Sequence, residues 1–204
     1  MKRISTRTKL LFGILVIVLA ITTILVVSYH NLTSIQKSQH EMTNSLETIN
    51  LLTQIRSDEN RLRALVLEMI IVEDRDHQEL MERQVVERHG TIETRVDSVL
   101  NNLSHYPQLR EDVAILFDSM LVVHKNRVVN MELAKSGKTK EAIDLVTTSQ
   151  ESRYNRVRSG LLEVEKQLAA STLMEKAEVE SKTQRTITIL IISGVIIFLI
   201  ALWF

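Results

Sequence analysis

The sequence predicts an all-α protein: an up-down-up-down four-helix bundle whose helices 1 and 4 continue into two transmembrane helices. Turn formers are rare, since the 204 residues include five glycines and one proline. Two apolar runs, residues 10–29 and 187–204, are 20 and 18 residues long. Each run can cross a hydrocarbon layer of ~30 Å as a helix that rises ~1.5 Å per residue. Between the runs, apolar residues recur at helical spacing.

The first apolar run is predicted to be an uncleaved membrane anchor. Four basic residues and no acidic residue precede it: Lys2, Arg3, Arg7 and Lys9. Positive charge favours the cytoplasmic side, so residues 1–9 are predicted to be cytoplasmic. A signal peptide is the alternative, but no A-x-A-like cleavage site follows the run. Residues 30–186 then form a periplasmic sensor domain of an inner-membrane protein with two spans, and Trp203 and Phe204 suit the second cytoplasmic interface.

Charge and motif content exclude several classes of function. All 25 acidic residues lie between residues 31 and 186 with 21 basic ones, a net charge of −4, which does not indicate nucleic-acid binding. No P-loop, G-x-S-x-G, dinucleotide fingerprint or H-E-x-x-H motif occurs, so we expect neither an enzyme nor a cofactor. His89 and His124 fall at similar heights, but two histidines without a third ligand are a weak metal signal, and no metal site is predicted.

Breaks in helical periodicity place the helix ends. The first helix is expected to continue from its span to about Val72, and the second to run from about residue 77 to 103. Pro107 suits the first turn of the third helix, and Gly137 suits the cap after its end. The fourth helix is predicted to start with Thr139 as its N-cap and to continue unbroken to residue 204. Within it, Gly160 lowers helix propensity and can permit close helix approach, and it is interpreted as a tolerated weak point rather than a hinge.

Polar residues interrupt the inward stripes of two helices at one height. Counting in sevens places Arg56, Asn60 and Arg63 inward on the first helix. The fourth helix steps inward through Ile143, Thr147, Gln150 and Tyr154. Measured from the tip of the bundle the two gaps coincide, and His89 and Arg127 fall in the same layer. Without an inward carboxylate, this layer is predicted to be electropositive.

An electropositive layer suggests an anionic ligand. An unpaired buried guanidinium costs several kcal/mol, so these arginines must lie at a groove, pair with Glu59 or another acid, or bind an anion. Guanidinium groups suit bidentate capture of a carboxylate, and hydroxyl and amide groups suit the rest of a small polar ligand. The alternative is that the arginines lie on a dimer-facing or solvated side with their stems packed.

The whole plan resembles the sensor half of a methyl-accepting chemotaxis protein. The local likeness is "ELAKSGKTKEAIDLV", which is similar to this family's connection between its third and fourth helices through Leu133, Ala134, Gly137, Glu141 and Ala142. The resemblance implies a homodimer and cytoplasmic signalling partners reached through a region beyond Phe204. It also implies a ligand site at the dimer interface, formed by Arg56, Arg61, Arg63, Thr147, Gln150 and Tyr154. Their spacing differs from the pattern of aspartate and serine receptors, so neither ligand is assigned.

The coincident polar gaps and the unbroken fourth helix lead us to expect that ligand binding favours one small axial or rotational offset of helix four relative to helix one, and that the continuous helix carries this offset through the membrane. Two alternative functions remain. The same sensor can be joined to a histidine kinase or a cyclase, or the bundle can be a ligand-free membrane-anchored scaffold.

Overall fold

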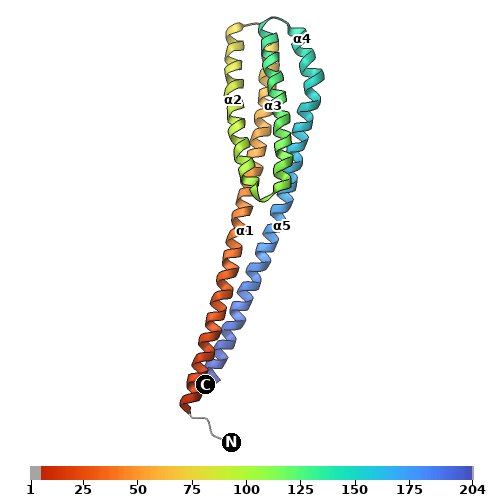
Figure 1. Cartoon of the computed structure of the whole chain (residues 1–204). Coiled ribbons are helices and arrows are strands. Elements are labelled where there is room, and N and C mark those ends of the chain that lie inside the picture. Colours follow the sequence, from red (N-terminus) through yellow and green to blue (C-terminus); the bar gives the residue numbers. More distant parts are fainter. Residues whose placement is uncertain (1–5, 204) are drawn as a thin grey trace. The chain divides into compact units, whose positions relative to one another are not determined.

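The computed structural model describes residues 6–203 and contains no strand within them (Figure 1). The predicted all-α class is confirmed. The basic residues Lys2 and Arg3 and the aromatic Phe204 lie outside the described residues. The helices are α1 (Thr6–Ile71), α2 (Arg75–Asn102), η1 (Leu103–His105), α3 (Pro107–Lys135), α4 (Thr139–Asp144), η2 (Leu145–Gln150) and α5 (Glu151–Trp203).

The chain divides into two units. The bundle unit is Thr43–Thr172, and the paired-helix unit is Met1–Met42 together with Leu173–Phe204. Helices α1 and α5 contribute residues to both units. The predicted membrane boundaries at residues 29/30 and 186/187 stay predictions.

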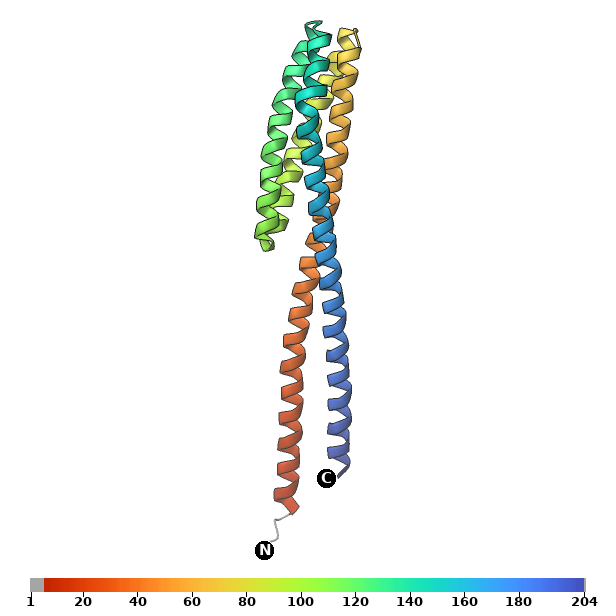
Figure 2. The same ribbon diagram turned by 90° about the vertical axis from the view of Figure 1, so that its right-hand side faces the viewer.

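Within the bundle unit, α2 and α3 run beside the bundle parts of α1 and α5 in alternating directions (Figures 1 and 2). The buried stripe of α1 steps by three and four residues through Ser45, Thr48, Leu52, Ile55, Glu59, Leu62, Val66 and Met69. This heptad pattern lies beside the predicted one, which passed through Arg56, Asn60 and Arg63. Both series have period seven, and the apolar residues Leu52, Ile55 and Leu62 decide which one faces the core.

The turns that close the bundle follow local capping chemistry. Gly137 has a φ of 71°, as its predicted capping role requires. The Gly137 N–H donates to the Ala134 carbonyl at 3.0 Å and the Lys138 N–H to the Leu133 carbonyl at 2.9 Å, which is a Schellman motif. Thr139 was expected to be the N-cap of the next helix, but Lys138 holds that position without a side-chain hydrogen bond.

The predicted unbroken fourth helix contains a π-helical segment, η2, between α4 and α5. The Thr147 hydroxyl donates to the Ile143 carbonyl at 2.9 Å and the Thr148 hydroxyl to the Asp144 carbonyl, so both threonines compete for the carbonyls of the preceding turn. A π turn adds a residue and shifts the register. The buried series accordingly runs through Ala142, Val146, Gln150, Tyr154 and Val157, and the predicted inward positions Ile143 and Thr147 are exposed.

Gly160 allows α5 to approach α3 closely. A Cβ atom at this position would lie 2.4 Å from Leu116 Cδ2. The leucine side chain therefore occupies the space that any larger residue would need. This contact supports the close helix approach that Gly160 was expected to permit.

The paired-helix unit exposes its apolar side chains. Both α1 and α5 carry a stretch long and apolar enough to cross a membrane. Leu11, Leu15, Leu25, Ile191 and Phe198 are all more than half exposed, which suits contact with lipid. The Asn31 Nδ2 donates to Thr186 Oγ1 at 3.1 Å and so links the two helices. Two apolar helices at the chain ends are consistent with membrane spans that flank a sensor domain.

Candidate functional site

A small hollow lies beside the π-helical segment, and we call it the η2 hollow. It has a volume of about 20 Å³ and is lined by Arg63, Val66, Val123, Arg127, Val146, Gln150, Glu151 and Tyr154. This volume suits about one water molecule. Helices α1, α3 and α5 and the segment η2 all contribute to it, so the chain brings distant residues together here. Three predicted site residues, Arg63, Gln150 and Tyr154, are among them.

Gln150 is the least satisfied polar side chain of the η2 hollow. Its side chain lies at the end of η2 and the residue is 7 % exposed. The Nε2 atom is buried and has no hydrogen-bond partner. An unpaired buried donor costs about 1–3 kcal/mol, so a ligand acceptor placed here would gain the interaction that the protein itself leaves unmade.

Arg63 and Tyr154 form the outer part of the same hollow. The guanidinium carbon of Arg63 lies 4.9 Å from the centre of the Tyr154 ring, a cation–π contact. The Tyr154 hydroxyl donates to Asn60 Oδ1. Arg63 Nη2 also lies 3.5 Å from Glu151 Oε1, and these two side chains are 35 % and 46 % exposed. The Arg63 ion pair is therefore long and solvated.

Arg127 is held differently, because Glu59 is buried beside it. The two Nη atoms of Arg127 donate to the two carboxylate oxygens of Glu59, in bidentate geometry. The side chains are 4 % and 7 % exposed. The layer was predicted to have no inward carboxylate, and this is wrong: the corrected stripe of α1 places Glu59 in the core. Pairing with Glu59, one of the three outcomes considered, applies to Arg127.

The remaining predicted site residues lie outside the η2 hollow. Arg56 pairs with Glu165 at 3.2 Å. Burial raises the pKa of the Glu165 carboxyl, and the Arg56 charge opposes this rise. Asn60, Arg61 and Thr147 are exposed, although Asn60 touches the site through the hydroxyl of Tyr154.

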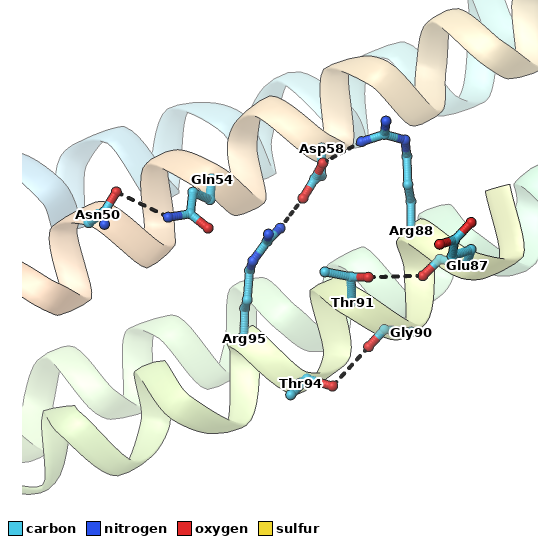
Figure 3. Close-up of polar contacts among 9 residues, drawn as sticks. All are labelled: Asn50, Gln54, Asp58, Glu87, Arg88, Gly90, Thr91, Thr94 and Arg95. Carbon is cyan, nitrogen blue, oxygen red and sulfur yellow. Dashed lines mark hydrogen bonds and ion pairs between the residues drawn. The ribbon is translucent and has the colours of Figure 1, made fainter. Parts of the chain in front are cut away.

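A second polar cluster joins α1 to α2, and sequence reasoning missed it. Asp58 accepts from Arg88 at 2.8 Å through Oδ1 and from Arg95 through Oδ2 (Figure 3). Arg88 and Arg95 are seven residues apart and so share one face of α2. Two arginines at this spacing on one helix, together with an acidic residue on the neighbouring helix, could have indicated the cluster from the sequence.

The two histidines that were predicted to share a height are stacked. The rings of His89 on α2 and His124 on α3 are 3.3 Å apart and 3° from parallel. Burial, the His89 ring and the Arg127 charge lower the pKa of His124 to about 4. Among the described residues no group of three or more histidine, cysteine, aspartate or glutamate side chains could hold a metal ion.

Comparison with known families matches most of this chain. The model of a family described as a four helix bundle sensory module for signal transduction matches residues 3–172. The matched range includes every residue of the η2 hollow. No curated protein sequence matches the chain.

Proposed function

Because the chain belongs to the family of four-helix-bundle sensory modules for signal transduction, we propose that it is the sensing part of a transmembrane chemoreceptor. Its ligand is a small anion that carries a carboxylate, and the η2 hollow is the binding site. The supporting observation is the buried, unpartnered Nε2 of Gln150 in a hollow that also contains Arg63.

Arg63 is the cation that can accept a ligand. Its contact with Glu151 is 3.5 Å long between half-exposed side chains, and such pairs contribute at most about 1 kcal/mol. A ligand carboxylate can therefore replace Glu151 at little cost. Arg127 is a poor alternative, because removing Glu59 from a buried pair leaves an uncompensated charge.

The η2 hollow is small, so side chains around it must move when the proposed ligand binds. About 20 Å³ is too small for an organic acid. Arg63 and Glu151 lie at the surface, so their side chains can turn outward and open the hollow without disturbing the core.

Signal transmission begins at η2 in this proposal. A π-helical segment has poorer hydrogen bonds than an α-helix and occurs often at functional sites. A ligand bonded to Gln150 would favour one arrangement of η2, and with it one axial offset or rotation of α5, which continues as a helix to Trp203. The output would act through cytoplasmic partners.

A periplasmic position of the bundle and a homodimer complete the proposal. The basic N-terminal segment supports the orientation in an inner membrane. The exposed residues Ile115, Val122 and Val129 recur every seven positions along α3 and support pairing of two copies. Light scattering of the full chain in nanodiscs tests this point: Val122→Glu should give monomers, and an unchanged monomer mass before and after the substitution would reject the dimer.

Calorimetry on the full chain in nanodiscs tests the ligand site. A panel of organic acids and amino acids should contain at least one compound that binds. Arg63→Gln should weaken its binding at least tenfold, whereas Arg61→Gln, the same charge change on the exposed neighbour, should leave it unchanged. The proposal fails if no anion binds, or if both substitutions weaken binding equally. A stoichiometric protein partner without any ligand would then favour the scaffold alternative.

A further inference from the structure

A larger hollow between α2 and α3 is separate from the η2 hollow, and we call it the α2–α3 hollow. Its volume is about 420 Å³, within the range of small-molecule sites. The lining residues are Glu59, His89, Ile92, Glu93, Val96, Asp97, Leu100, Ala114, Phe117, Asp118, Met120 and Leu121. The two hollows share no lining residue.

The wall of the α2–α3 hollow is mostly apolar. Ile92, Phe117 and Met120 are buried in the core, and Leu121 is 46 % exposed at the surface. Val96 and Leu100 are half-buried. An aromatic ring and several aliphatic side chains around one concavity favour a ligand with a hydrocarbon body.

The charges of this hollow all have one sign. Glu59, Glu93, Asp97 and Asp118 line it, and among its described lining residues none is lysine or arginine. Glu59 is neutralised by Arg127, and Glu93 Oε1 lies 3.3 Å from His89 Nε2. Glu93, Asp97 and Asp118 are exposed. The stacked His89 has a buried Nδ1 atom without a hydrogen-bond partner. Carboxylates with an apolar surface suit a cation that can also pack its hydrocarbon part.

We propose that the α2–α3 hollow is a second ligand site, for a small organic ammonium ion with an apolar or aromatic body. The hydrocarbon part packs on Phe117, Val96 and Leu121. The ammonium group lies near Asp97 and Asp118, which come from the two helices that form the hollow. Such a ligand is opposite in charge to the anion of the η2 hollow, so the sensor would respond to two chemical classes through separate sites.

The test compares benzylamine with benzyl alcohol, which has the same ring but no charge, by calorimetry. The full chain is used in nanodiscs of phosphatidylcholine, because neutral lipid does not concentrate amines. Benzylamine should bind saturably and at least tenfold more tightly than the alcohol. Equal affinity for both, or no saturation, would overturn the proposal.

Variants locate the binding. The double variant Asp97→Asn with Asp118→Asn should weaken the binding of benzylamine at least tenfold. Both side chains are exposed, so the double variant should still fold. Asp112→Asn, an exposed acid on α3 that does not line the hollow, should change nothing. Ala114→Phe should block binding by filling the space. If Ala114→Phe leaves the affinity for benzylamine unchanged, the proposal is contradicted. It is also contradicted if Asp112→Asn lowers this affinity as much as Asp97→Asn with Asp118→Asn does.

The same titration separates this inference from the anion site. Arg63→Gln should leave benzylamine binding intact, since Arg63 does not line the α2–α3 hollow. A loss of benzylamine binding in Arg63→Gln would mean that the two hollows are one site, and would contradict the proposal.

Discussion

Asp58 and Glu59 are neighbours on α1, and each pairs with arginine on another helix in a different environment. Asp58 meets Arg88 and Arg95 of α2 nearer the surface: the two arginines are 41 % and 26 % exposed and Asp58 itself is 15 % exposed (Figure 3). Glu59 meets Arg127 of α3 in the core, at 7 % and 4 % exposure. The same ion-pair chemistry therefore joins two helices at a small cost in free energy near the surface, but it depends on complete pairing of the charges in the core.

The largest expected effect comes from breaking the buried pair. Arg127→Ala leaves the Glu59 carboxylate buried without its partner, and should lower the free energy of unfolding by about 3–5 kcal/mol. Urea unfolding of the full chain in detergent, followed by circular dichroism, measures it. The double variant Glu59→Leu with Arg127→Met should recover most of this loss, because an apolar pair needs no desolvation of charge. A double variant as unstable as the single one would contradict the desolvation argument.

The pH dependence of the free energy of unfolding tests the same core through the protonation of His124. Its folded pKa of about 4 lies below the ordinary value of 6.5. Between these two pH values the unfolded chain binds the proton more readily, so stability is complete above about pH 6.5 and falls as the pH drops toward 4. The ring is partly exposed, so solvent screening reduces the effect of the pKa shift, and we expect a loss on the order of 1–2 kcal/mol.

Unfolding curves between pH 4 and 7 measure this loss. His124→Gln should flatten the pH dependence, whereas the same change at the exposed His105 should leave it intact. If the free energy of unfolding of His124→Gln depends on pH as strongly as that of the original protein, groups other than His124 cause the pH dependence.

The surface pair should respond more weakly. Asp58→Asn removes the carboxylate shared by Arg88 and Arg95, and we expect a loss of about 1 kcal/mol. Unfolding in 1 M salt gives the control, because screening should reduce this loss but leave that of Arg127→Ala nearly unchanged. Equal salt dependence of both variants would remove the distinction between the two pairs.

The smallest expected change in stability concerns Gln150. Its buried Nε2 atom has no partner, so Gln150→Met should keep the free energy of unfolding within about 1 kcal/mol of the original value. The same substitution should abolish binding of the proposed anion. A stability loss above about 2 kcal/mol would show that Gln150 supports the fold, and would remove the main support for the ligand site.

The inward positions of the fourth helix were predicted correctly from the end of η2 onward and wrongly before that point. From the last residue of this segment onward, the predicted inward residues Gln150 and Tyr154 were placed correctly. Ile143 before the segment and Thr147 within it were expected inward, but the extra residue of the π turn places Ala142 and Val146 there instead. Helical counting assumes a constant period, and one added residue rotates the preceding turns by about 100°.

On α1 the difficulty was of another kind. A heptad count finds the period but not the phase when polar residues occupy both candidate stripes. Arg56, Asn60 and Arg63 on one stripe look like a polar gap, but Glu59 on the other is the buried residue. Its partner Arg127 is 68 positions away in the chain, and no local pattern reveals that pairing.

The sequence by itself determined the helical class, the two apolar stretches and the main turns. Those features depend on local chemistry: helix propensity, the length of an apolar run, a glycine that can adopt a positive φ and a proline at a helix start. Tertiary structure alone decided which face of α1 is buried, which acid neutralises Arg127 and which residues line each hollow. These outcomes depend on the packing of helices far apart in the chain, where burial and pairing are set by neighbours that local pattern cannot identify.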